Sequence, residues 1–275
     1  MPAISRYIKI LSIPDLLQRR SELEKILSSE GINYARLESQ DIINYEFESG
    51  SGENANYLFS AHYDNYRLSP GANDNIAAIC ILIDLYKELD SRKIPAKFVF
   101  TDAEETNHAG AKFYAETHNL KTLSGVINLD LCGYGDSIVI NGNIKRFTNK
   151  NLLARHNAEL VKFLPESDDI IYRKNHVPVI NLAIVPKWDV QYLKALASFG
   201  ERLLGQPPEF DLIFSQMEIT QTFHGGIKDS PEFIQDSAMT KIFNYLLDSI
   251  TYKQEEKWIK TCLKIFSRLI KKLRS

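Results

Sequence analysis

Apolar residues recur along this chain with two different periods, and each period predicts a different kind of element. Residues 14–29 carry leucine and isoleucine at helical spacing with charges between them, which predicts an amphipathic helix. Residues 41–49 alternate as a strand does, and the Gly- and Ser-containing segment 50–54 then predicts a hairpin loop. The long apolar segment 76–89 predicts a helix packed on a sheet.

Short continuous apolar runs predict buried strands elsewhere in the chain. These runs cover residues 56–62, 97–102, 125–131 and 178–185, and a helix is predicted over 151–164. Strands that alternate with helices indicate an α/β fold, with a mostly parallel central sheet flanked by helices on both faces. In such sheets ligands bind at the carboxyl ends of the strands, so polar residues at those ends are the first candidates for a functional site.

Two imidazoles and three carboxylates stand in local contexts that suit metal binding, several of them at predicted strand ends. Divalent cations of the zinc type take carboxylate oxygen and imidazole nitrogen. Two such ions, held roughly 3.5–4 Å apart, can activate a water molecule and polarise a carbonyl group. The candidate ligands are His62, Asp74, Glu105, Asp130 and His224.

Two further acids have roles beside these ligands. Glu104 precedes Glu105, and adjacent residues leaving a strand point in different directions, so Glu104 can serve as a general base while Glu105 faces a metal. Asp64 is two residues from His62 and shares its face in an extended segment, so its carboxylate can orient the imidazole. His108, which has no such context, is predicted to be structural or exposed.

The order of these motifs resembles the M28 family of zinc peptidases, which includes aminopeptidases and glutaminyl cyclases. The family's motifs H-x-D, G-A-x-D-N, E-E, N-x-D and a late His correspond here to residues 62–64, 71–75, 104–105, 128–130 and 224. The resemblance covers roughly residues 56–250 and implies a zinc aminopeptidase-like α/β/α sandwich. It also implies a non-proline cis peptide after the bridging acid, at Asp74–Asn75.

The resemblance further implies how two Zn²⁺ ions, or Mn²⁺ or Co²⁺ in their place, would be shared out. Asp74 would bridge the two ions. His62 and Asp130 would complete one site, and Glu105 and His224 would complete the other.

Three departures from the family pattern concern the substrate rather than the metal. Phe223 stands before the late His, where many family aminopeptidases carry a Tyr whose phenol can stabilise an oxyanion. Residues 167–169 look like the family's S-D-H motif, with Asp169 in place of its His. We assign Asp168 and Phe223 to substrate binding. Residues 186–222 have no counterpart in the family core and predict an insertion near the site.

The two ends of the chain and its composition set the remaining expectations. We expect one catalytic domain over 1–252, followed by a basic amphipathic helix over 253–275. That helix would dock on the domain or on a partner, and the alternative is an anionic membrane surface. A net charge of −2 gives no reason to expect nucleic acid as a partner.

Three widely separated cysteines fit neither a disulfide framework nor a thiolate zinc site. With no apolar leader segment at the N-terminus, this pattern predicts a cytoplasmic protein.

The function we expect is a dinuclear metal-dependent aminopeptidase that removes N-terminal residues from peptides with a free N-terminus, as a monomer or a homo-oligomer. A glutaminyl cyclase, which works with one zinc ion and forms N-terminal pyroglutamate, is the first alternative. An inactive M28-like binding protein is the second. The 12-position spacing from His62 to Asp74 and the presence of both His62 and Asp130 favour the two-metal enzyme.

Overall fold

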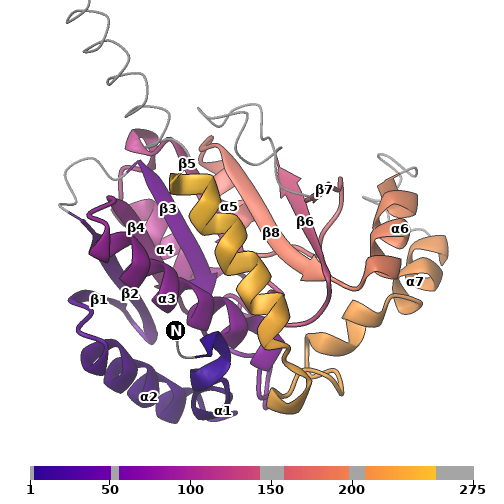
Figure 1. Ribbon diagram of the computed structural model, residues 1–275, viewed down its shortest axis with the longest axis horizontal. Coiled ribbons are helices and arrows are strands. Elements are labelled where there is room, and N and C mark those ends of the chain that lie inside the picture. Colours follow the sequence, from indigo (N-terminus) through magenta and orange to yellow (C-terminus); the bar gives the residue numbers. More distant parts are fainter. Residues whose placement is uncertain (1–2, 51–55, 143–157, 198–207, 252–275) are drawn as a thin grey trace, which may run out of the picture.

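One mixed sheet organises the fold. The computed structural model describes all residues except 1–2, 51–55, 143–157, 198–207 and 252–275 (Figure 1). The strands form an eight-stranded sheet in the order β1-β2-β4-β3-β5-β8-β6-β7. They are β1 (Tyr34–Ser39), β2 (Ile42–Ser49), β3 (Tyr57–His62), β4 (Ala96–Thr101), β5 (Gly125–Leu129), β6 (Ser137–Gly142), β7 (Glu159–Leu160) and β8 (Val179–Val185).

The middle of the sheet is parallel, and the flanks contain antiparallel pairs together with the parallel edge pair β6–β7. β3 pairs in parallel with β4 and β5, and β5 pairs in parallel with β8. β2 runs antiparallel to both β1 and β4, while β6 runs antiparallel to β8. The predicted fold class, a mostly parallel sheet with helices on both faces, is confirmed. The carboxyl ends of the central strands share one edge, where the candidate ligands lie.

Successive residues of the central strands pack into two different cores. Phe59 and Ile127 belong to the larger core, with α3 (Ala77–Ser91) and the helix over 236–251. Leu58 and Val126 point to the opposite face, with α4 (Ala109–Thr117) and α5 (Asp169–Lys174). Figure 1 shows α3 and the helix over 236–251 crossing one face of the sheet. This two-sided burial explains why the strands read as continuous apolar runs.

A third cluster of buried side chains lies at the β6 side of the sheet. It joins strands β6 and β8 to α6 (Lys187–Leu196) and α7 (Pro208–Ser215), which extend away from the central layers in Figure 1. In the described part of 186–222 the segment therefore contributes α6 and α7. Its last residues form a short 3-10 helix, Glu218–Thr222, that leads directly into Phe223 and His224.

Two predictions about local structure were wrong. The strand over 42–49 makes no hairpin with the strand over 57–62, because β4 lies between them in the sheet. The helix predicted over 151–164 is contradicted at its described end, where residues 159–160 form a short strand beside β6. Residues 151–157 lie outside the described residues. In both segments a partner that is distant in sequence decided the structure.

The N-terminal helix α2 (Leu16–Ser29) supports the loop that follows β3. Asp15 caps α2 through the backbone N–H of Gln18, and α1 (Ile8–Leu11) precedes it. The fully buried Arg19 donates from Nη1 to the carbonyls of Tyr63 and Asp64, both at 3.0 Å, and from Nη2 to that of Pro70 at 2.6 Å. Its Nε also donates to the carbonyl of residue 13 at 3.0 Å. One guanidinium thus fixes the backbone on both sides of residues 65–69.

A cluster of charged groups joins the end of α2 to the α3 helix. Glu30 pairs with Arg6 at 3.2 Å and also with Lys87, while Arg6 reaches Asp84 at 2.6 Å. Although burial opposes it, the hydrogen bonds from Lys87, Tyr7 and Arg6 lower the pKa of Glu30 to about 2. The folded state therefore favours the ionised form of Glu30.

Within the described residues, no helix is both long enough and apolar enough to cross a membrane. The basic helix predicted over 253–275 lies outside the described residues, so its docking partner stays a prediction.

Candidate metal centre

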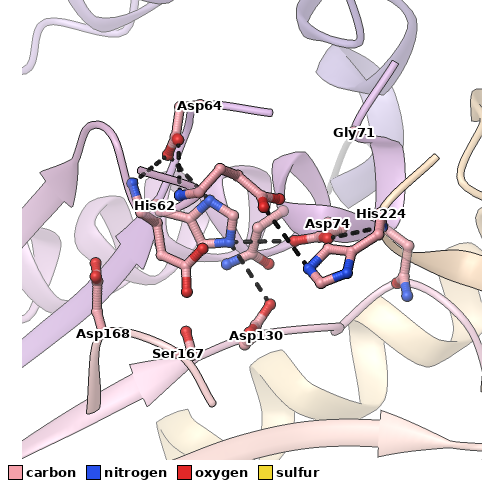
Figure 2. Close-up of polar contacts among 12 residues, drawn as sticks. His62, Asp64, Gly71, Asp74, Asp130, Ser167, Asp168 and His224 are labelled. Carbon is pink, nitrogen blue, oxygen red and sulfur yellow. Dashed lines mark hydrogen bonds and ion pairs between the residues drawn. The ribbon is translucent and has the colours of Figure 1, made fainter. Parts of the chain in front are cut away.

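The five candidate ligands converge at the carboxyl edge of the sheet in two groups that share one residue. The first group is His62, Asp74 and Asp130, and the second is Asp74, Glu105 and His224. Within each group, one ligand atom per residue lies within 4.8 Å of the others. Figure 2 shows His62 at the end of β3, facing Asp74 and Asp130, with His224 on the far side of Asp74. This is the grouping that the resemblance implied.

Each carboxylate oxygen of Asp74 faces a different ligand group. Its Oδ1 lies 3.2 Å from Nε2 of His62, and its Oδ2 accepts the backbone N–H of His224 at 3.2 Å. The same Nε2 is 3.8 Å from Asp130 Oδ1, while His224 Nε2 is 3.6 Å from Glu105 Oε2. The Asp74–Asn75 peptide is cis, as expected. A carboxylate with this placement is suited to bridging two cations.

The carboxylate of Asp64 holds three parts of the site together. Its Oδ1 lies 3.2 Å from His62 Nδ1 and accepts the backbone N–H of Glu104 at 3.0 Å. Its Oδ2 accepts the N–H of Glu105 at 3.1 Å. Asp64 is buried, so these bonds fix both the imidazole and the adjacent glutamates. The orienting role predicted for Asp64 is supported by this geometry, although the sequence did not reveal its link to the glutamate backbone.

The donor atoms fit a divalent cation. Within the described chain, His62 Nε2, Glu105 Oε1 and Asp130 Oδ1 are buried without a hydrogen-bond partner. Burial and then Asp74 raise the pKa of Glu105 to about 9. Burial lowers the pKa of His62, but Glu104 and the surrounding acids raise it well above its ordinary value. Buried acids that crowd together in this way repel one another, and a cation among them would offset that repulsion.

Two residues that support this centre were missed from sequence. Asp229 is buried and accepts the backbone N–H groups of Asn73 and Asp74 at 2.9 and 3.2 Å, and the hydroxyl of Ser69 at 2.5 Å. It therefore fixes the loop that carries the bridging acid. Nothing in the local sequence of Asp229 marks it, because its partners are more than 150 positions away.

His108 was predicted to be structural or exposed, and the structure places it beside the candidate base, a contact that the sequence did not indicate. Its Nδ1 is 3.1 Å from Glu104 Oε1, and Asp168 completes a third cluster with these two residues. Glu104 is buried, and that burial, offset in part by His62, raises the pKa of Glu104 to about 7. His108 stands four residues after Glu104 in a loop, where the chain has no helical or strand period. No periodic pattern in the sequence could therefore reveal the contact between the two side chains.

The two residues assigned to substrate binding lie in different surroundings. Phe223 is 9% exposed, packs with the side chains of α6 and α7, and meets the His224 ring edge-on at 4.9 Å. Asp168 is fully buried below the site, where it accepts a hydrogen bond from Thr101. A direct contact of either residue with substrate stays a prediction, as does the role of 186–222 as an insertion.

A pocket of about 750 Å³ opens beside the second ligand group. Asp64 and Glu105 line the end nearest the centre, and Leu16, Leu17 and Tyr66 are among the residues that line the rest. The Tyr66 ring stacks on the imidazole of His224 at 4.9 Å. The pocket therefore borders the second ligand group through Glu105.

Comparison with known proteins identifies the family. A family model described as Peptidase family M28 matches residues 43–250, and this chain belongs to that family. The putative endoplasmic reticulum metallopeptidase 1 of Schizosaccharomyces pombe is 34% identical over 88 residues. These residues are 30% of this chain but only 11% of that protein, so the match spans a small part of the relative.

Solved structures share the fold. BSAP, a zinc aminopeptidase from Bacillus subtilis, superposes with a TM-score of 0.58 at 17% identity, covering 77% of this chain and 50% of that one. The glutaminyl cyclase of Porphyromonas gingivalis gives a TM-score of 0.64 at 14% identity, covering 91% and 97% respectively. At these identities the likeness establishes the fold alone, and the choice between the two chemistries depends on the site.

Proposed function

We propose that this protein is a dinuclear metal-dependent aminopeptidase that hydrolyses the N-terminal residue from peptides. The observation that carries the proposal is the sharing of Asp74 between two complete ligand groups, each with one imidazole and two carboxylates. A single cation would need only one of the groups. If that cation were held by the second group, the fully buried imidazole of His62 in the first group would face Asp74 and Asp130 with no cation between them.

The residues would divide the work of hydrolysis among them. The five ligands would hold a pair of Zn²⁺ ions, which would supply an activated water molecule and a polarised carbonyl group. Glu104 accepts the proton of the attacking water and delivers it to the leaving amine. Asp64 holds the Glu104 and Glu105 backbone in place. The ammonium group of the substrate is attracted to the excess of carboxylates, which favours removal of terminal residues over internal cleavage.

The test is mass spectrometry of a mixed peptide pool incubated with the zinc-loaded protein, with and without a chelator. Stepwise loss of N-terminal residues that the chelator abolishes is the expected result. The Glu104→Gln variant should lose this activity while binding the same amount of metal, measured by elemental analysis. Full activity in Glu104→Gln would refute the assignment of the base, and a pool left unchanged by the wild-type protein would refute the peptidase.

A glutaminyl cyclase is the second candidate, and one observation favours it. Asp74, Glu105 and His224 alone provide the Asp, Glu and His trio that holds one zinc ion, and this is the group with an exposed member, since the His224 side chain is 56% exposed. Loss of ammonia only from peptides that begin with Gln, with one metal ion per chain, would establish the cyclase. Two ions per chain with general N-terminal trimming would exclude it.

A further inference from the structure

The imidazole of His108 lies between the candidate base and a buried carboxylate. Its Nδ1 is 3.1 Å from Glu104 Oε1 and 3.5 Å from Asp168 Oδ1. Asp168 is fully buried, and the Thr101 hydroxyl donates to its other oxygen. In the described part of the chain, His108 Nδ1 and Asp168 Oδ1 are buried and neither makes a hydrogen bond. They lie close enough to each other, and Nδ1 close enough to Glu104 Oε1, for these groups to satisfy them.

The backbone holds the imidazole over Glu104. The N–H of His108 donates to the carbonyl of Glu104 at 2.8 Å, and the N–H of Ala109 donates to that of Ala103 at 2.9 Å. Asn107 and His108 both have left-handed backbones, with φ of 62° and 55°. This conformation is uncommon outside glycine, and here it turns the chain back so that residue 108 meets residue 104. The α4 helix begins immediately afterwards and fixes the turn.

We propose that His108 is a positioning residue for the general base, with its Nδ1–H shared between Glu104 Oε1 and Asp168 Oδ1. The proposal rests on the proposed function, because it assigns a partner to the base of that reaction. With Oε1 engaged, the carboxylate cannot rotate freely, and its other oxygen is left to accept a proton from water. A general base must be held within a narrow range of positions to act, and a misplacement of about 1 Å can cost on the order of 100-fold in rate.

The surrounding charges support this arrangement. Asp168 and then Glu104 raise the pKa of His108 to about 10, so Nδ1 keeps its proton at neutral pH. Asp168 is in turn anchored by Thr101, so a fixed carboxylate lies beside the same Nδ1 atom that faces Glu104. In structures without substrate, hydrogen bonds of catalytic groups are often long and tighten in the complex, which suits the 3.1 and 3.5 Å distances seen here.

Two substitutions of matched shape test the role of the Nδ1 donor. Asn tolerates a left-handed backbone and carries an amide N–H₂ close to the position of Nδ1, whereas Asp has the same shape and tolerance but only accepts. We expect kcat of His108→Asn to exceed that of His108→Asp by about 10- to 100-fold, with KM and bound metal the same in both. Equal kcat in the two variants, or a difference confined to KM, would overturn the proposal. So would a third metal ion in the wild type that both variants lose.

A second measurement does not depend on activity. In protein labelled with ¹⁵N-histidine, the His108 imidazole signals are identified by their absence from His108→Asn. We expect a proton on Nδ1 whose resonance moves in both Glu104→Gln and Asp168→Asn. Signals that stay unchanged in these variants would refute the contact. If the wild-type protein trims no peptide, the proposed function fails, while this spectrum still decides whether His108 is joined to Glu104.

Discussion

Replacing Asp64 by Asn should weaken metal binding and destabilise the metal-free protein at the same time. The Asn side chain keeps the shape of Asp but replaces one oxygen by an amide that donates. If its oxygen stays beside His62 and the Glu104 N–H, its amide faces the N–H of Glu105. The opposite orientation would place the Asn N–H₂ group against two donors, the His62 ring N–H and the Glu104 N–H, instead of the single N–H of Glu105. The first orientation is therefore favoured.

The magnitudes follow from these contacts. One buried donor left without an acceptor costs about 1–3 kcal/mol, which we expect as a loss in the free energy of unfolding. The imidazole of His62 loses an anionic partner, and changes of this kind reduce metal affinity by about 10- to 100-fold.

Urea denaturation in the presence of a chelator measures the loss of stability, and competition with a fluorescent zinc chelator measures the loss of affinity. Wild-type affinity in Asp64→Asn would refute the claim that Asp64 orients His62. Unchanged stability would refute the claim that it fixes the glutamate backbone.

Three further predictions concern residues outside the candidate ligand set. Glu30→Gln should lower the free energy of unfolding by about 1–2 kcal/mol at pH 7, because the lowered pKa of Glu30 means that its ionised form stabilises the folded state. Urea titrations should show the full stability difference between wild type and variant above pH ~4.5, and its loss as the pH falls towards 2. Arg19→Lys leaves unpaired at least one of four carbonyls, two of which lie in buried contacts and two in part-buried ones, so the urea midpoint should fall by an amount equivalent to about 1–3 kcal/mol. Gly110→Ala places a methyl group 2.2 Å from the Asp102 carbonyl oxygen, and calorimetry should show a loss of about 3 kcal/mol or an unfolded protein.

The sequence predicted the parts of the site that depend on strand ends. His62, Glu105 and Asp130 follow apolar runs, and parallel strands bring their carboxyl ends to a common edge. That physical rule needs no knowledge of which strands are neighbours. The pairing of strands was harder, and the hairpin predicted at 50–54 was wrong because β4 pairs with both β2 and β3. Register and neighbours depend on contacts between distant segments, which a local pattern does not contain.

The groups that support the ligands were invisible in the sequence for a similar reason. His108 reaches Glu104 only because two successive residues adopt left-handed backbones. Asn and His adopt this conformation more often than most residues, but their types alone do not show that both positions do so here. Asp229 lies in a loop near the end of the described chain and bonds to the loop of Asp74. Tertiary structure brings His108 and Asp229 to their partners, and the residue type of each gives no sign of which partner that is.

The contacts of α2 show that the part of the chain that holds the candidate site together begins before the family match. The family match starts at residue 43, yet Arg19 and Arg20 lie before it. Arg19 holds the backbone around residues 63–70, and Arg20 bonds to the Tyr63 hydroxyl at 3.1 Å and to Asp102. A protein trimmed to the matched boundary would keep every ligand and lose the groups that hold the ligand loops. Expression designs and domain exchanges for this protein should therefore retain α2 with the catalytic core.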